Sequence, residues 1–238
     1  MIKNYIFDLY GTLLAIRTDE YHLSFWRKMC KVYRQYGIRY KPVELRRKYA
    51  DLCLKEERLM SDRQYPEINL LNVFSSLLKG KRGNAEEIAT LFRASSRLYC
   101  FPYENTITVL EKLKKQGKKI YLLSNAQHVF TMKELEDSGL IQYFDGIYIS
   151  SDYGIKKPDP AFMEILLEKE SLKKEECVMI GNDFDSDIAT AQACGMKSIF
   201  LNTDKHDTAY LHKQSQNKNV RIIESGDIRE ILKEEEYA

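Results

Sequence analysis

Short apolar runs alternate with longer segments in which apolar residues recur at helical spacing, and this pattern predicts strands and helices in turn. The runs typical of buried strands cover residues 5–7, 119–123, 146–149, 177–180, 198–201 and 220–223. Strands that alternate with helices form right-handed βαβ units. We therefore predict an α/β fold with a Rossmann-like three-layer core, in which helices cover both faces of a mostly parallel sheet.

A helical segment separates the first strand from the others. Four amphipathic helices are expected there: one carries Trp26 and Met29 on one face and ends near Gly37, and the others lie over residues 45–59, 68–78 and 85–98. Eighty residues are enough for a small domain of their own. We expect a core formed by residues 1–16 and 99–238 and a helical insert formed by residues 17–98.

The composition is that of an ordinary globular protein. The 238 residues are 44% apolar, and 37 basic and 35 acidic side chains leave a net charge of +2, which gives no reason to expect nucleic acid or membrane as a partner. Five scattered cysteines without paired spacing argue against disulfides and structural zinc and favour a reducing compartment. No stretch approaches the ~20 apolar residues of a membrane span. We expect a cytoplasmic monomer or homodimer.

Polar residues able to perform chemistry follow four of the predicted strands. Asp8 follows the first strand, Ser124 and Asn125 the second, Lys157 comes after the third, and the segment 181–187 follows the fourth. Taken alone, each motif can be explained by a structural role, because Ser-Asn is a common turn and acidic residues commonly cap helices. Because the carboxyl ends of parallel strands meet at one edge of a sheet, we expect these residues to form one site.

The order of these residues resembles the four-motif signature of the haloacid dehalogenase superfamily: a nucleophilic Asp, a Ser or Thr, a Lys and an acidic loop. The resemblance is carried by Asp8-Leu9-Tyr10-Gly11-Thr12-Leu13, Leu123-Ser124-Asn125, Lys156-Lys157-Pro158-Asp159-Pro160 and the segment from Asp187 to Gly195-Met196. The insert between the first two motifs resembles the C1-type cap of that family. This implies a hydrolase whose cap closes over the active site and sets specificity.

Asp8 is the expected nucleophile, because a carboxylate can form an acyl-phosphate or ester intermediate that water then cleaves. Ser124 would bind oxygens of the transferring group, and Lys157 would add a fixed positive charge. The expected catalytic residues are Asp8, Tyr10 and Lys157, and the expected substrate-binding residues are Thr12, Ser124, Asn125 and Arg27.

A charge count favours a magnesium ion. Asp183 and Asp187 stand four residues apart, so a helix between them would place both carboxylates on one side. Together with Asp8 and opposed only by Lys157, they would carry about two excess negative charges, which one Mg²⁺ removes. The expected ligands are Asp8, the main-chain carbonyl of Tyr10, Asp183 and Asp187. We therefore predict Mg²⁺-dependent hydrolysis of a small phosphorylated metabolite.

Two positions depart from the phosphatase pattern of the family. Asn182 stands where many family phosphatases carry an Asp, so Asp183 is a candidate to take that ligand's role. Tyr10 replaces a second Asp that protonates the leaving group, and a phenol with a pKa near ~10 is a weak base in its neutral form. Replacing Tyr10 with Asp is therefore expected to accelerate phosphate-ester turnover.

The first motif is also similar to that of the 2-haloacid dehalogenases, which use no metal and whose halide leaving group needs no proton. Arg27 then corresponds to their halide-binding Arg. Metal-independent dehalogenation through an ester at Asp8 is the main alternative, although the acidic surplus at Asp183 and Asp187 disfavours it. A phosphonatase-like reaction would need a Schiff-base Lys that the sequence does not identify. A phospho-ligand binding protein without turnover is the non-enzymatic alternative.

Overall fold

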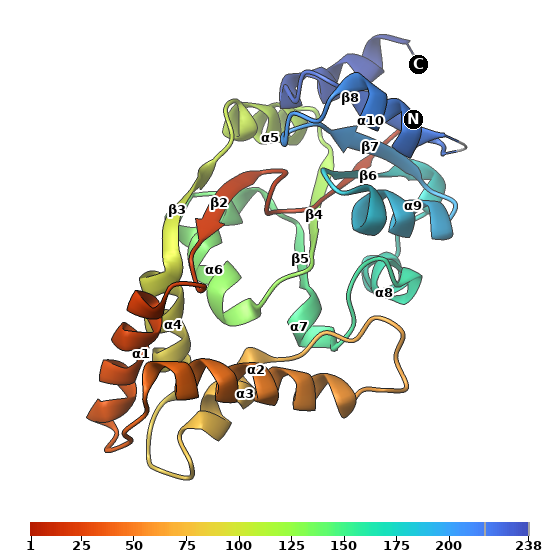
Figure 1. The fold of residues 1–238 in the computed structure, drawn as a ribbon. Helices are drawn as coiled ribbons and strands as arrows, with labels where there is room; N and C mark the ends of the chain where they lie inside the picture. Colours follow the sequence, from red (N-terminus) through yellow and green to blue (C-terminus); the bar gives the residue numbers. More distant parts are fainter. Residues whose placement is uncertain (217, 238) are drawn as a thin grey trace.

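A parallel six-stranded sheet forms the centre of the protein, seen here in a computed structural model that describes residues 1–216 and 218–237 (Figure 1). The strand order is β5-β4-β1-β6-β7-β8. The strands are β1 (Asn4–Phe7), β4 (Lys119–Ser124), β5 (Gly146–Ile149), β6 (Cys177–Gly181), β7 (Lys197–Leu201) and β8 (Val220–Ile223). The first strand pairs with β4 on one side and β6 on the other, so the residue after it emerges at the middle of the sheet.

Alternate residues of the central strands face two layers of helices, as the two-residue period of a strand requires. Tyr5 and Phe7 pack against one layer, whereas Ile6 packs against the other. The first layer contains α5 (Thr106–Lys115), α6 (His128–Asp137) and η4 (Ile228–Tyr237), and the second contains α8 (Pro160–Lys169) and α9 (Ala189–Ala193). The predicted three-layer α/β core is therefore confirmed.

The remaining elements of the core are short, apart from one further helix. They are α7 (Ser150–Tyr153), α10 (Thr208–Ser215), η1 (Ile141–Tyr143), η2 (Lys174–Glu176) and η3 (Phe184–Ile188). Phe184 of η3 stacks on Phe200 of β7, and Leu211 of α10 joins the same apolar cluster. Within the described part of the chain, no helix combines the length and the apolar character needed to cross a bilayer.

The first four helices of the chain pack on one another at one end of the molecule (Figure 1). They are α1 (Leu23–Gln35), α2 (Pro42–Arg58), α3 (Leu70–Leu77) and α4 (Ala85–Ser96). Aromatic rings fill their interior; the edge-to-face pair Phe25 and Phe92 has ring centroids 4.9 Å apart. Phe130 of α6 belongs to the same cluster, so the insert shares its apolar interior with a helix of the core.

An antiparallel two-stranded ribbon joins the insert to the sheet, and the sequence pattern did not predict it. The ribbon consists of β2 (Leu14–Thr18) and β3 (Arg97–Pro102). The helix predicted over residues 85–98 ends at Ser96, because the chain from Arg97 onward pairs with β2 instead. Both expected borders between core and insert, at residues 16 and 99, therefore fall inside the ribbon.

Candidate active site

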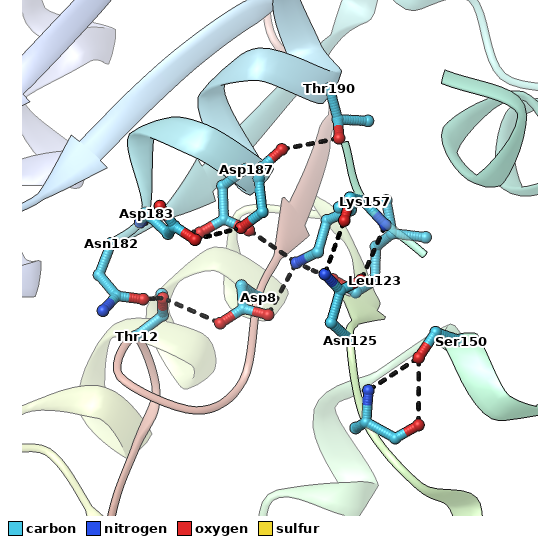
Figure 2. Close-up of polar contacts among 12 residues, drawn as sticks. Asp8, Thr12, Leu123, Asn125, Ser150, Lys157, Asn182, Asp183, Asp187 and Thr190 are labelled. Carbon is cyan, nitrogen blue, oxygen red and sulfur yellow. Dashed lines mark hydrogen bonds and ion pairs between the residues drawn. The ribbon is translucent and has the colours of Figure 1, made fainter. Parts of the chain in front are cut away.

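Three predicted site residues meet at the carboxyl ends of β1, β4 and β6 (Figure 2). Lys157 Nζ donates to Asp8 Oδ1 at 2.8 Å, to Asp187 Oδ1 at 2.7 Å and to the carbonyl oxygen of Leu123 at 2.7 Å. Asp8 is held in place by its own N–H, which donates to the carbonyl of Ile180 in β6. The ammonium group thus makes three hydrogen bonds, the most that it can donate.

The Asp8–Lys157–Asp187 cluster is withdrawn from water, so its charges interact strongly. The side chain of Lys157 is 1% exposed and that of Asp187 is 2% exposed. Burial by itself would lower the pKa of Lys157, but Asp187 and Asp8 outweigh it and the pKa is raised. Burial raises the pKa of Asp187 to about 7, with Lys157 opposing the rise and Asp8 adding to it. One cation shared by two carboxylates leaves the cluster short of positive charge.

Ser124 is the last residue of β4 and Asn125 the first residue after it, and the two side chains have different surroundings. The Asn125 amide is bound by the main chain of Lys157, because its Nδ2 donates to the Lys157 carbonyl at 2.9 Å and its Oδ1 accepts from the Lys157 N–H at 2.8 Å. Asn125 therefore holds the lysine loop in place. Ser124 Oγ is buried and has no hydrogen-bond partner among the residues that the structure describes. An unpartnered buried hydroxyl is costly unless a ligand satisfies it.

The two later carboxylates are placed differently from the expectation. Asp183 is exposed, and its carboxylate accepts from the N–H of Asp185 at 2.9 Å and from Ser186 Oγ at 2.7 Å, so it caps η3. Asp187 Oδ2 instead reaches back to the N–H of Asp183 at 3.1 Å. Over residues 1–216 and 218–237, no three His, Cys, Asp or Glu side chains form a group able to hold a metal ion. The predicted trio of Asp8, Asp183 and Asp187 is thus not assembled.

Gly181 makes room for the Asp187 carboxylate. A Cβ atom at this position would lie 2.0 Å from Asp187 Oδ2, far inside any allowed contact. The glycine at the end of β6 is therefore needed for the Asp8–Lys157–Asp187 cluster to form.

Thr12 and Asn182 lie on the other side of Asp8. Thr12 Oγ1 is 3.4 Å from Asp8 Oδ2 and 3.2 Å from Asn182 Oδ1. A hydroxyl donates one proton, so it can serve only one of these acceptors at a time, and Asp8 Oδ2 keeps at best a long hydrogen bond. Asn182 Nδ2 donates to Asp204 Oδ2 at 3.0 Å. Asp204, which follows β7, was not predicted from the sequence as a site residue.

A cavity of about 390 Å³ lies beside Asp8. Its polar wall is formed by Asp8, Tyr10, Asn125, Lys157, Asn182, Asp183, Ser186, Asp187, Asp204, His206 and Tyr210. A second cavity of about 380 Å³ lies under the insert and shares Tyr10 and Asn125 with the first. Arg27 is exposed on α1 and is not part of either wall.

The phenol of Tyr10 is bound by helix α6. Its hydroxyl donates to Glu134 Oε2 at 2.5 Å and lies 3.0 Å from Thr131 Oγ1. Arg93 of the insert makes two hydrogen bonds to the Glu134 carboxylate, which is 1% exposed, and Arg97 makes a third. Burial, and then the negative charge of Glu134, raise the pKa of Tyr10. Its side chain therefore links the first-motif loop to α6 and the insert.

Comparison with known proteins adds a family relationship. A family model of haloacid dehalogenase-like hydrolases matches residues 2–195. A glyceraldehyde 3-phosphate phosphatase of Methanothermobacter thermautotrophicus is 30% identical over 132 residues, which are 55% of this chain and 58% of that protein. The chain spans about half the length of the curated relatives that it matches.

Two solved structures have the same fold over nearly the whole chain. A HAD phosphatase from Thermococcus onnurineus covers 97% of this chain and 98% of its own, with a TM-score of 0.60 and 22% identity. The L-2-haloacid dehalogenase from Xanthobacter autotrophicus covers 98% and 99%, with a TM-score of 0.58 and 18% identity. At such identities the likeness concerns the fold, so the reaction has to be argued from the site itself.

Proposed function

The chain belongs to the haloacid dehalogenase-like hydrolases, and we propose that it is a Mg²⁺-dependent phosphatase acting on a small phosphorylated metabolite. The observation that carries the proposal is the buried Asp8 carboxylate. One of its oxygens is held by Lys157 at 2.8 Å, while the other has, within the described part of the chain, only a contact of 3.4 Å with Thr12. The unpartnered hydroxyl of Ser124 at the end of the neighbouring strand supplies a donor for a phosphate oxygen.

The reaction would proceed through a covalent intermediate. A carboxylate oxygen of Asp8 attacks phosphorus, the bond from phosphorus to the leaving alkoxide breaks, and an aspartyl-phosphate forms. Water then attacks the same phosphorus and the bond from phosphorus to Asp8 breaks, which releases inorganic phosphate and restores the carboxylate. Over the whole cycle, the alkoxide gains the proton that this water loses. Lys157 orients Asp8 and stabilises negative charge on the transferring group, and Asn125 fixes Lys157 through its main chain.

The residues beside Asp8 fit a magnesium ion. Mg²⁺ prefers hard oxygen donors and is usually bound through one or two carboxylates together with water and substrate phosphate. Asp8 Oδ2 and Asn182 Oδ1 lie on either side of the Thr12 hydroxyl, and we propose them as ligands together with the main-chain carbonyl of Tyr10. A bound Mg²⁺ would neutralise charge on the substrate phosphate. Asp183 and Asp187 have other partners and are not included.

The four-helix insert would serve as the cap. The cavity beneath it adjoins the cavity at Asp8 and is lined by Glu20, Tyr49, Phe92 and Arg93. We propose that the part of the substrate beyond the phosphate lies there, where aromatic rings shield it from water.

Phosphate release tests the proposal directly. We expect release from p-nitrophenyl phosphate and from members of a panel of phosphorylated metabolites with Mg²⁺, and loss of that release in EDTA, because the site is short of positive charge without a cation. Chloride release from 2-chloropropionate is measured in parallel. Chloride release that persists in EDTA would instead establish the dehalogenase alternative, and ligand binding without either product would establish a binding protein.

Replacing Tyr10 tests how the site manages protons. Tyr10→Asp should accelerate hydrolysis of an alkyl phosphate by up to about 10²-fold, because a carboxyl group can protonate the alkoxide and then deprotonate water. The gain should be much smaller with p-nitrophenyl phosphate, whose leaving group needs no proton. The matched variant Tyr10→Phe loses the hydroxyl contacts with Glu134 and Thr131, which lie on α6, and should change kcat by less than about threefold. A large fall in kcat for folded Tyr10→Phe would show that the phenol takes part in the reaction.

A further inference from the structure

The amide of Asn182 connects the nucleophile to a carboxylate on a different loop. Its Oδ1 faces the Thr12 hydroxyl, which also contacts Asp8, and its Nδ2 donates to Asp204 Oδ2 at 3.0 Å. Figure 2 shows Asn182 and Thr12 on the side of Asp8 opposite Lys157. The Asn182 amide therefore directs its oxygen toward Asp8 and its N–H group toward Asp204. Because a carboxylate can only accept hydrogen bonds, Asp204 fixes the amide in this orientation.

The surrounding backbone holds Asn182 in this position. Gly11 has a φ of +84°, and a Cβ atom there would lie 2.4 Å from Asn182 Nδ2. Thr203 Oγ1, on the loop that carries Asp204, donates a hydrogen bond to the carbonyl oxygen of Gly11. The first-motif loop and the loop after β7 thus enclose the amide between them, and Asp204 reaches the site through Asn182.

Asp183 and Asp187 already have partners, so Asp204 is the remaining carboxylate that can act next to Asn182. Asp187 shares the Lys157 cation with Asp8, and the Asp183 carboxylate is bound to the start of η3. Apart from Asp183, the cavity wall contains the carboxylates of Asp8, Asp187 and Asp204 and the single ammonium group of Lys157. This is an excess of about two negative charges, which a divalent cation would balance.

We propose that Asn182 and Asp204 together replace a single carboxylate ligand at the cation site. Asn182 Oδ1 binds the ion beside Asp8, and Asp204 orients the amide from behind and adds the negative charge that the amide lacks. This inference rests on the proposed Mg²⁺ dependence of the enzyme. Partners of this kind, one shell away from the ion, commonly change metal affinity by about 10–100-fold when they are removed.

Binding of Mn²⁺, followed by electron paramagnetic resonance, tests the role of Asp204 without turnover. Asp204→Asn should raise the dissociation constant about 10–100-fold, because it removes the charge and the best acceptor for the Asn182 amide. Asp185→Asn is the matched control, since Asp185 is exposed, lies three residues after Asn182 in η3 and is not part of the cavity wall. It should change the constant by less than about threefold. Equal losses in both variants, or none in Asp204→Asn, would overturn the inference.

Exchanging the two side chains gives a sharper test. The double variant Asn182→Asp with Asp204→Asn keeps one amide and one carboxylate in contact and the same net charge, so it should recover Mn²⁺ affinity to within about threefold of the wild type. Failure of the exchange in a protein with an unchanged thermal melt would refute the pairing. Phosphate release by the same samples is recorded separately. If the wild type released no phosphate but Asp204→Asn still weakened Mn²⁺ binding, the proposed reaction would be refuted while the cation site would be supported.

Discussion

Asp8→Asn should lower kcat for phosphate release by roughly 10⁴–10⁶-fold while the protein stays folded, as expected when a nucleophile is removed from a preorganised site. Asn has nearly the same shape as Asp, and its Oδ1 can still accept the hydrogen bond that Lys157 Nζ now makes at 2.8 Å. The fold is expected to survive because Lys157 keeps Asp187 and the Leu123 carbonyl as partners. What the variant lacks is a nucleophilic oxygen.

The covalent intermediate provides a second measurement of the same prediction. Wild-type enzyme quenched in acid during turnover should carry a phosphoryl adduct on the peptide that contains Asp8, and Asp8→Asn should carry none. Asp137→Asn is a control with the same chemical change at an exposed ion pair with Lys133, and it should retain full activity. Appreciable turnover in pure Asp8→Asn, or an adduct on another residue, would refute the role of Asp8.

The convergence of Asp8, Ser124 and Lys157 was predictable because it depends on local pattern and topology alone. Apolar runs identify the strands, and a parallel sheet brings their carboxyl ends together. The structure confirms this sheet, with β1 between β4 and β6. Asp8 follows β1, Ser124 ends β4 and Lys157 comes after β5, so their positions along the sequence already indicate the edge of the sheet at which they lie.

The surroundings of Tyr10 and Asn182 were not predictable, because their partners lie far away in the sequence. Glu134 is 124 residues from Tyr10 and belongs to a helix whose sequence gives no sign of a role at the site. Asp204 is 22 residues from Asn182 and lies on a loop after an ordinary buried strand. Hydrogen bonds between loops depend on the exact path of the backbone, to which hydrophobic periodicity is insensitive.

The Asp183 and Asp187 prediction shows how a correct spacing can mislead. The two residues are four apart, but Asp183 precedes the first turn of η3 and caps it, whereas Asp187 lies within the turn and points to Lys157. An acidic residue directly before a helix commonly caps that helix. The Asp183 carboxylate caps η3 in this way, whereas the Asp187 carboxylate pairs with Lys157.

Lys157→Met should have the largest effect on stability and should also abolish turnover. The substitution keeps much of the side-chain volume but leaves the buried carboxylates of Asp8 and Asp187 without their shared cation. Removing one partner from a buried ion pair typically costs about 3–5 kcal/mol, because the remaining charge is neither solvated nor paired. We expect a loss of this size in the free energy of unfolding from urea denaturation.

A second substitution separates the electrostatic cause from simple loss of packing. Adding Asp187→Asn to Lys157→Met removes one of the two uncompensated carboxylates, so part of the lost stability should return. Activity should not return, because the positive charge beside Asp8 is still missing. Lys156→Met is the control, since Lys156 is partly exposed and does not line the cavity at Asp8. If the double variant were no more stable than Lys157→Met, the destabilisation would come from packing, and the buried pair of carboxylates would not be ionised together in the folded protein.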